Sequence, residues 1–206
     1  MKKIIGAVML VVAAVCSSSA QKTTATYKLG DIVSDFKLKN VDGTMRGLVT
    51  DAGREKGYIV IFTCNHCPYA KAYEQRIMDL DKNFRQSGYP VVAINSNDPK
   101  EAPEDSFEKM AERAKEKNYT FPYLFDESQA IAKKFGAVRT PQVFLLNRNK
   151  QGKLELVYTG AIDNNWEDAA KAHRHYVEEA LTDLSENLKP ATAETKAIGC
   201  TIKWKK

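Results

Sequence analysis

Hydrophobic and polar residues occur along the chain in blocks whose spacing changes from strand-like to helix-like. Residues 58–62 carry no charge and are rich in Ile, Val and aromatic side chains, which predicts a strand buried on both faces of a mainly parallel sheet. After Pro68 the pattern becomes helical, because proline suits a first helical turn and the apolar residues then follow at steps of four, three and four. These apolar residues are Tyr73, Ile77, Leu80 and Phe84.

Further elements are predicted on either side of this centre. Residues 36–39 alternate as a half-buried strand should, and the Asp42-Gly43 turn after them predicts an N-terminal hairpin. Downstream, the pattern predicts strands at 91–94, 142–146 and 154–159 and helices at 105–117 and 128–135. The order of elements therefore predicts an α/β fold with a mixed central sheet flanked by helices.

A final helix is expected from an Asn164 or Asn165 cap to Leu188. His173 lies on its apolar stripe, which predicts a packed and hydrogen-bonded histidine, whereas His175 lies off the stripe and should be exposed. In the helix at 105–117 the first turn is acidic and the last is basic, as the helix dipole favours. We interpret these charges, including Asp105, as a solvated face.

The first 20 residues have the pattern of a secretory signal peptide: Lys2 and Lys3, an apolar core at 4–15, and small residues up to Ala20. That core is too short to span a bilayer, which needs about 20 residues. Lipid attachment at Cys16 is a less favoured alternative, because the residue before it is bulky. We therefore expect a periplasmic or otherwise exported protein.

Four segments follow from this division of the chain. They are a signal peptide at 1–20, a flexible lead-in at 21–28, one domain at 29–188 and an irregular C-terminal tail at 189–206. No stable membrane span is expected after cleavage. The two lysines of the first segment lower the net charge from +5 to +3 when they are removed, which is too weak to indicate a nucleic-acid partner.

Cleavage would leave three cysteines, Cys64, Cys67 and Cys200. Because three is an odd number, at least one is free, transiently bonded or joined to another molecule. Cys64 and Cys67 form a Cys-x-x-Cys motif at the predicted helix start, where unpaired N–H groups and the helix dipole favour a thiolate. We expect Cys64 to be the more exposed sulfur with a lowered pKa, and Cys67 to resolve mixed disulfides.

His66, between the two cysteines, adds positive charge when it is protonated, which should lower the pKa of Cys64 further and make the pair more oxidising. Cys200 leaves two interpretations open. It is either a third thiol that accepts the disulfide from the pair, which requires Cα atoms within about 7 Å, or a buried or surface thiol without a redox role.

A Cys-x-x-Cys pair also occurs in zinc sites and in structural disulfides. Zinc needs four ligands, and Cys200, His66, His173 and His175 do not supply a second pair at the usual spacing. Copper delivery by the reduced pair is a binding alternative. We expect no cofactor and no resident metal.

Taken together, these elements resemble the thioredoxin fold and, more closely, the exported redoxins of the alkyl hydroperoxide reductase and thiol-specific antioxidant superfamily. The residues that carry the resemblance are Leu29-Gly30-Asp31, Phe36-Lys37-Leu38, Asp42-Gly43, Phe62 to Pro68, Phe121-Pro122 to Asp126, and Thr140-Pro141. The resemblance implies a cis Thr140–Pro141 bond that faces Cys64 and holds the extended backbone of a substrate. It also implies thiol-disulfide exchange with exported thiol or disulfide proteins and an unknown redox donor or acceptor.

Two departures from that family pattern are visible. Gly57 and Ile61 stand where peroxide-reducing members have a proline and a Thr or Ser, which argues against peroxidase chemistry. A thiol peroxidase with an antioxidant role is therefore the alternative function and not the preferred one. Thioredoxin itself has a buried acid in the strand before its motif, and residues 58–63 contain none. A proton acceptor for Cys67 must therefore lie elsewhere in the chain or be water.

Overall fold

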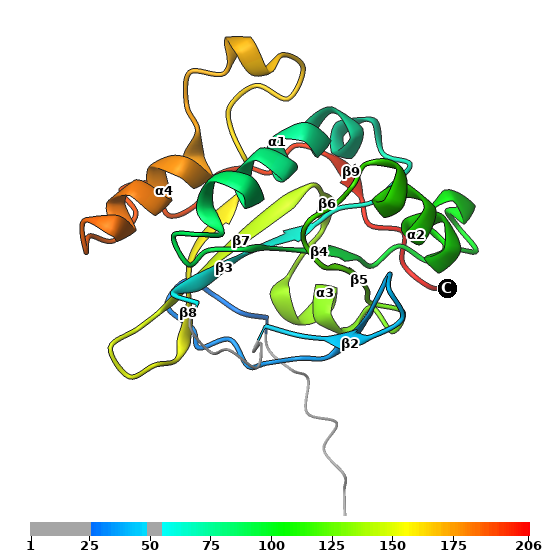
Figure 1. Ribbon diagram of the computed structural model, residues 1–206, viewed down its shortest axis with the longest axis horizontal. Helices are drawn as coiled ribbons and strands as arrows, with labels where there is room; N and C mark the ends of the chain where they lie inside the picture. The colour runs from blue at the N-terminus through cyan, green and yellow to red at the C-terminus, as the bar shows by residue number, and fades with distance from the viewer. Residues whose placement is uncertain (1–25, 49–54) are drawn as a thin grey trace, which may run out of the picture.

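The computed structural model describes residues 26–48 and 55–206, and the predicted signal peptide lies outside these ranges. Seven strands form one sheet in the order β2-β1-β5-β4-β3-β7-β8, and β6 and β9 form a separate two-stranded sheet (Figure 1). The strands are β1 Leu38–Asn40, β2 Met45–Arg46, β3 Gly57–Phe62, β4 Val91–Asn95, β5 Tyr123–Phe125, β6 Arg139–Thr140, β7 Gln142–Arg148, β8 Leu154–Gly160 and β9 Cys200–Thr201.

Four α-helices and two short 3₁₀ helices connect the strands in the described ranges. They are α1 Pro68–Phe84, η1 Pro103–Asp105, α2 Phe107–Glu116, α3 Ala130–Phe135, η2 Ala169–Lys171 and α4 Tyr176–Ser185. Within the residues that the structure describes, no helix combines the length and apolar character needed to cross a membrane.

Strand β3 is an inner strand of the sheet, and all six of its residues are buried. It pairs in parallel with β4 and antiparallel with β7, while β8 and the β1–β2 hairpin extend the two sides. The sheet is therefore mixed and flanked by helices, as the sequence predicted. The predicted N-terminal hairpin is also confirmed, with Gly43 in its turn at a φ of +84°.

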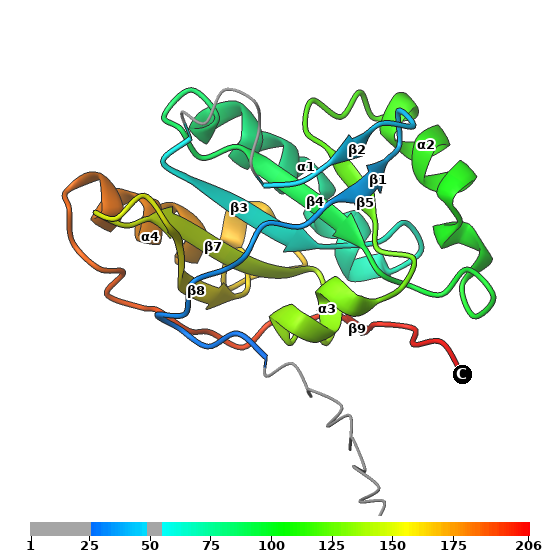
Figure 2. The same cartoon turned by 90° about the horizontal axis from the view of Figure 1, so that it is seen from below.

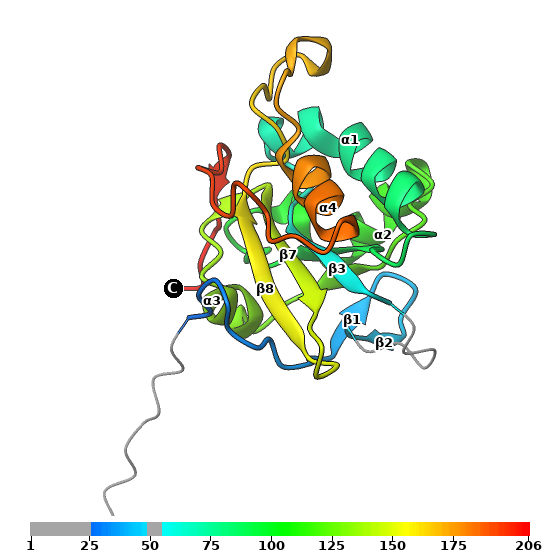
Figure 3. The same ribbon diagram turned by 90° about the vertical axis from the view of Figure 1, so that its left-hand side faces the viewer.

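Alternate residues of β3 enter two different cores, as the period of a strand requires. Ile59 and Ile61 face the core that α1, α2 and α4 cover, whereas Tyr58, Val60 and Phe62 face the core that α3 helps to cover. Figure 2 shows α3 on the face opposite α1, and Figure 3 shows the same two layers from the β8 side. The end of β3 and the start of α1 therefore have fixed positions within the packed layers.

The final helix is shorter than the sequence predicted, since α4 begins only at Tyr176. Arg76 of α1 lies 2.6 Å from the Asp163 carboxylate and from the Asn165 carbonyl, so the chain after β8 is fixed to α1 in a loop whose one helical part is the short η2. This loop projects beyond α1 (Figure 1). His173 is consequently exposed rather than packed, which corrects that part of the prediction, but its ring is hydrogen-bonded to the Asn164 side chain, as expected. His175 is exposed, also as expected.

The C-terminal tail, residues 189–206, was expected to be irregular but contains strand β9. Its residues Cys200 and Thr201 pair antiparallel with Thr140 and Arg139 of β6. Sequence periodicity could not detect a two-residue strand, because its pairing depends on a segment about 60 residues away.

Gly57 at the start of β3 allows a close contact that a larger residue would prevent. A Cβ atom there would lie 2.0 Å from the Leu146 carbonyl oxygen of β7. We expect Gly57→Ala to lower the free energy of unfolding in urea by about 1–3 kcal/mol, the usual cost of overpacking. Met45→Ala, at an exposed position of β2, is the control and should change it little; equal stability of the Gly57→Ala protein and the parent would contradict the packing described here.

Candidate active site

Cys64 and Cys67 lie where β3 gives way to α1. Cys67 is the N-cap residue of α1 and Pro68 occupies the first helical turn, as the sequence predicted. Cys64 lies in the turn before the cap, where the backbone N–H groups of Cys67 and His66 act to lower the pKa of its thiol. The helix start therefore acts in the expected direction on Cys64.

The Thr140–Pro141 peptide bond is cis, which confirms the expectation from the resemblance. The Thr140 hydroxyl lies 3.2 Å from the Cys64 sulfur, and the Thr140 carbonyl oxygen lies 3.3 Å from the Cys67 sulfur. One residue beside the cis bond therefore contacts both cysteines of the motif.

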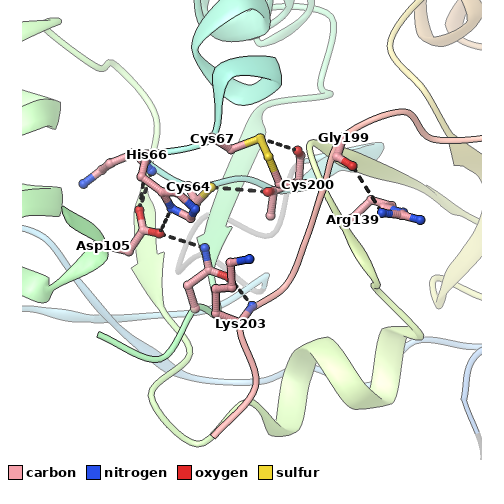
Figure 4. The surroundings of a disulfide bond; sticks show 11 residues. Cys64, His66, Cys67, Asp105, Arg139, Gly199, Cys200 and Lys203 are labelled. Atoms are coloured by element: carbon pink, nitrogen blue, oxygen red, sulfur yellow. Dashed lines mark hydrogen bonds and ion pairs between the residues drawn. A yellow bond between two sulfur atoms is a disulfide. The ribbon is translucent and has the colours of Figure 1, made fainter. Parts of the chain in front are cut away.

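The disulfide in the structure joins Cys67 to Cys200, with the two Cα atoms 6.0 Å apart, and Cys64 is a free thiol (Figure 4). This differs from the predicted Cys64–Cys67 pair. The distance meets the condition set for Cys200 as a third redox thiol, and the interpretation of Cys200 as an unpaired thiol is wrong for this structure. The chain forms this bond because β9 aligns Cys200 opposite Thr140.

Cys64 is the more exposed of the two motif cysteines, as expected, but its relative accessible surface is only 6%, and Cys67 is fully buried. The expected acidity of Cys64 is not found. Burial, followed by the nearby negative charge of Asp105, raises the pKa of Cys64 to about 11, although the hydrogen bonds from Thr140 and the helix start act in the opposite direction. Desolvation and a like charge therefore outweigh the helix start, and the prediction of a lowered pKa is wrong.

Asp105 is the site residue that the sequence analysis missed. Interpreted as part of a solvated helix face, it is instead completely buried. Its carboxylate accepts hydrogen bonds from the Asn65 backbone N–H at 2.6 Å and from the Asn97 side-chain amide at 2.7 Å. A buried carboxylate needs such donors, and η1 places it beside the cysteines. The lack of an acid in residues 58–63 was the available signal that one would come from elsewhere in the chain.

His66 also contacts Asp105, through Nδ1 at 2.5 Å (Figure 4). Because a carboxylate only accepts hydrogen bonds, Nδ1 carries the hydrogen in this contact. The His66 side chain remains partly exposed. Asp105 therefore holds the imidazole at the edge of the site, next to the Cys64 thiol.

Cys64, His66 and Asp105 offer sulfur, nitrogen and oxygen donor atoms that all lie within 4.8 Å of one another. The hydrogen bonds to Asp105 already account for its burial. Cys67, which copper delivery by the reduced pair would require, is bonded to Cys200. The hydrogen bonds of Asp105 are therefore sufficient to explain why the three side chains lie together. They add no support to the copper alternative.

The two positions that depart from the peroxidase pattern have structural reasons. Gly57 donates its backbone N–H to the Gly88 carbonyl at 3.1 Å, a bond that proline could not make. Ile61 is fully buried in the core under α1, α2 and α4. Neither residue contributes a polar group that could orient a peroxide at Cys64.

Comparison with known proteins identifies related families. The sequence model of the AhpC/TSA family matches residues 29–155. Thiol-disulfide oxidoreductase ResA from Geobacillus thermodenitrificans is 26% identical over 134 residues, which is 65% of this chain and 71% of the relative.

Two solved structures have folds similar to that of this chain. The crystal structure of an uncharacterized conserved protein from Geobacillus kaustophilus has 35% sequence identity and a TM-score of 0.78, covering 87% of this chain and 94% of that one. The exposed lipoprotein thioredoxin Etrx1 from Streptococcus pneumoniae has 24% identity and a TM-score of 0.50, covering 65% and 93% of the two chains. The predicted thioredoxin-like fold is thereby confirmed.

The effect of Asp105 on Cys64 can be measured in the oxidised full chain with Cys16→Ser, where Cys64 is the remaining free thiol. In Asp105→Asn the loss of a nearby negative charge should lower the pKa of Cys64. Iodoacetamide should then alkylate Cys64 about three- to tenfold faster at pH 8, as for a shift of about half to one pKa unit, and the pH–rate profile should move to lower pH.

Glu104→Gln removes an exposed charge next in sequence and is the matched control. Its alkylation profile should coincide with that of the parent. An Asp105→Asn profile that also coincides with the parent would contradict the electrostatic role of Asp105.

Proposed function

The chain belongs to the AhpC/TSA family and is a thiol-disulfide oxidoreductase, and we propose that Cys64 and Cys67 carry out the exchange. The observation that supports this assignment most strongly is a free thiol and a disulfide gathered around one cis peptide bond. Exchange requires a sulfur nucleophile next to a disulfide sulfur. The site provides both within one small cluster of cysteines.

In the proposed reaction the Cys64 thiolate attacks a partner's disulfide, and the leaving sulfur of the partner takes up a proton. Cys67 in its thiolate form then attacks Cys64, releases the second sulfur of the partner and leaves a Cys64–Cys67 disulfide. One disulfide is reduced and one is formed, so two electrons pass from the protein to the partner. The reverse sequence oxidises a dithiol partner.

The electrostatics of the site bear on its redox poise. A pair becomes more oxidising when its reduced form is stabilised as a thiolate. With the pKa of Cys64 raised to about 11, this sulfur is protonated at neutral pH and provides no such stabilisation. The sequence-based expectation of an oxidising pair therefore loses its basis, and we propose a more reducing site.

His66, Thr140 and Pro141 complete the proposed site. The Asp105 contact holds the imidazole of His66 beside Cys64, where it can take up or release the proton that accompanies exchange. Thr140 contacts both sulfurs of the motif. The backbone next to Pro141 is the edge on which we propose that an extended segment of a partner pairs.

We also propose that the chain acts outside the cytoplasm on exported thiol or disulfide proteins. The signal-peptide pattern of residues 1–20 supports this location. So does the relative from Streptococcus pneumoniae, which is described as an exposed lipoprotein.

The roles of the two motif cysteines can be separated by trapping. With Cys16→Ser and Cys200→Ser in both proteins, Cys67→Ser should accumulate mixed disulfides with a disulfide-containing substrate such as insulin, because no thiol remains to resolve them. Cys64→Ser should not. Non-reducing gels and mass spectrometry give the readout, and the reverse pattern would overturn the assignment.

Thiol peroxidase activity is a second candidate, which family membership and the Thr140 hydroxyl beside Cys64 favour. A peroxidatic cysteine must react as a thiolate, however, and the raised pKa of Cys64 opposes this. We therefore expect the reduced protein to consume hydrogen peroxide no faster per thiol than free cysteine, because Cys64 is protonated at neutral pH. In the same preparation it should reduce insulin readily; rapid peroxide turnover would favour the peroxidase.

A further inference from the structure

Strand β9 occupies the edge on which a partner's backbone would pair. Thr140 and Arg139 of β6 are matched to Cys200 and Thr201 in antiparallel register. The Arg139 guanidinium also reaches the Gly199 carbonyl at 3.4 Å (Figure 4). The tail thus lies beside the cis bond in the manner of a bound peptide strand.

Gly199 fits this position because the chain passes the cis peptide too closely for a side chain. A Cβ atom on Gly199 would lie 2.3 Å from the Thr140 carbonyl oxygen and 3.2 Å from the Pro141 nitrogen. Only glycine avoids these clashes without moving the strand or the cis peptide. The Gly-Cys sequence is therefore matched to the edge that it covers.

Residues on the far side of Cys200 anchor the tail. Ile202 is buried in the core that α3 helps to cover. The Lys203 carbonyl accepts hydrogen bonds from the Asp98 backbone N–H and the Gln129 side chain, both at 2.8 Å. Gln129 is itself almost completely buried. These contacts fix the register that places Cys200 at Cys67.

The anchor is also connected to the redox site. The Lys203 backbone N–H donates to the Asn97 side-chain oxygen at 2.8 Å, and the amide of the same side chain donates to Asp105 at 2.7 Å. Asp105 in turn holds His66 beside Cys64 (Figure 4). A docked tail therefore helps to order the carboxylate next to the free thiol.

From this arrangement we propose that residues 199–201 form a built-in substrate strand and that Cys200 is a third redox cysteine, which takes over the disulfide of the Cys64–Cys67 pair. This proposal rests on the proposed function and extends it to the tail. While the strand is docked, Arg139 and Thr140 are not available for pairing with an outside polypeptide.

The chemical step is an intramolecular exchange. The Cys200 thiolate attacks the Cys67 sulfur, the Cys67–Cys200 bond forms and the Cys64–Cys67 bond breaks. The electron pair leaves with Cys64, which takes up the proton that Cys200 lost, so neither an oxidant nor a reductant is consumed. Burial favours the neutral thiol of Cys64, which is the product of this step.

The exchange moves an oxidising equivalent toward the surface. Cys64 and Cys67 are buried, whereas Cys200 is partly exposed. An outside thiolate can attack Cys200 and release Cys67 as a thiolate, and a second partner thiol can then complete the partner's own disulfide. Cys200 is in this scheme the sulfur that meets a dithiol protein.

Disulfide mapping of the oxidised full chain with Cys16→Ser tests the proposal. Trypsin leaves Cys64 and Cys67 together on residues 57–71 and Cys200 on residues 197–203. After oxidation with oxidised glutathione, acid quenching and alkylation, the two peptides should be joined through Cys67, with Cys64 alkylated. In Cys200→Ser the disulfide should instead form within residues 57–71.

Gly199→Ala changes the docking of the strand and keeps all three redox cysteines. Its ratio of joined to separate peptides should fall at least tenfold relative to the parent. Ile198→Ala, at a neighbouring exposed position, is the control and should map like the parent. A parent protein with Cys200 alkylated after oxidation, or a Gly199→Ala protein that maps like the parent, would overturn the proposal.

Insulin reduction, measured on the same proteins, separates this inference from the proposed function. If the parent reduces insulin while its oxidised form carries only a Cys64–Cys67 disulfide, the built-in strand is wrong and the oxidoreductase stands. If the parent neither reduces insulin nor exchanges with glutathione, the proposed function fails whatever the disulfide map.

Discussion

The contacts of Thr140 bring together the three cysteines of the site. Its hydroxyl touches Cys64, its carbonyl oxygen lies against Cys67, and its backbone pairs with Cys200. The next peptide bond is cis and lies between β6 and β7. One residue thus contacts both sulfurs of the motif and provides the edge on which the tail lies.

The second constraint on the site is the burial of charge. A carboxylate without water needs several donors, and Asp105 obtains them from the turn between the cysteines and from Asn97. The same burial makes its charge effective at short range. The network that orients His66 therefore also adds to the burial of Cys64, which is the larger cause, in holding the neighbouring thiol in its neutral form.

Local sequence pattern was sufficient to predict most of the fold. The uncharged run before the motif, the helical spacing after Pro68 and the turn at Asp42-Gly43 each depend on neighbouring residues alone, and each is confirmed. The final helix was predicted too long because the Arg76–Asp163 ion pair, a contact between distant segments, holds its first half in a loop. Asp105 was misjudged for a similar reason: an acid before a helix usually faces water, and only the tertiary position of η1 shows otherwise.

The position of the disulfide has a thermodynamic consequence for the whole domain. A bond between Cys67 and Cys200 spans 133 residues, and in the chain-entropy description such a ring restricts the unfolded chain by about 5 kcal/mol, far more than the small ring of a Cys64–Cys67 bond. Transfer between the two pairings therefore alters the free energy of unfolding without any change in oxidation number. Because the two equilibria are linked, folding of the domain favours the Cys67–Cys200 pairing over the Cys64–Cys67 pairing. Conformational stability and the choice of sulfur partner are therefore coupled in this protein.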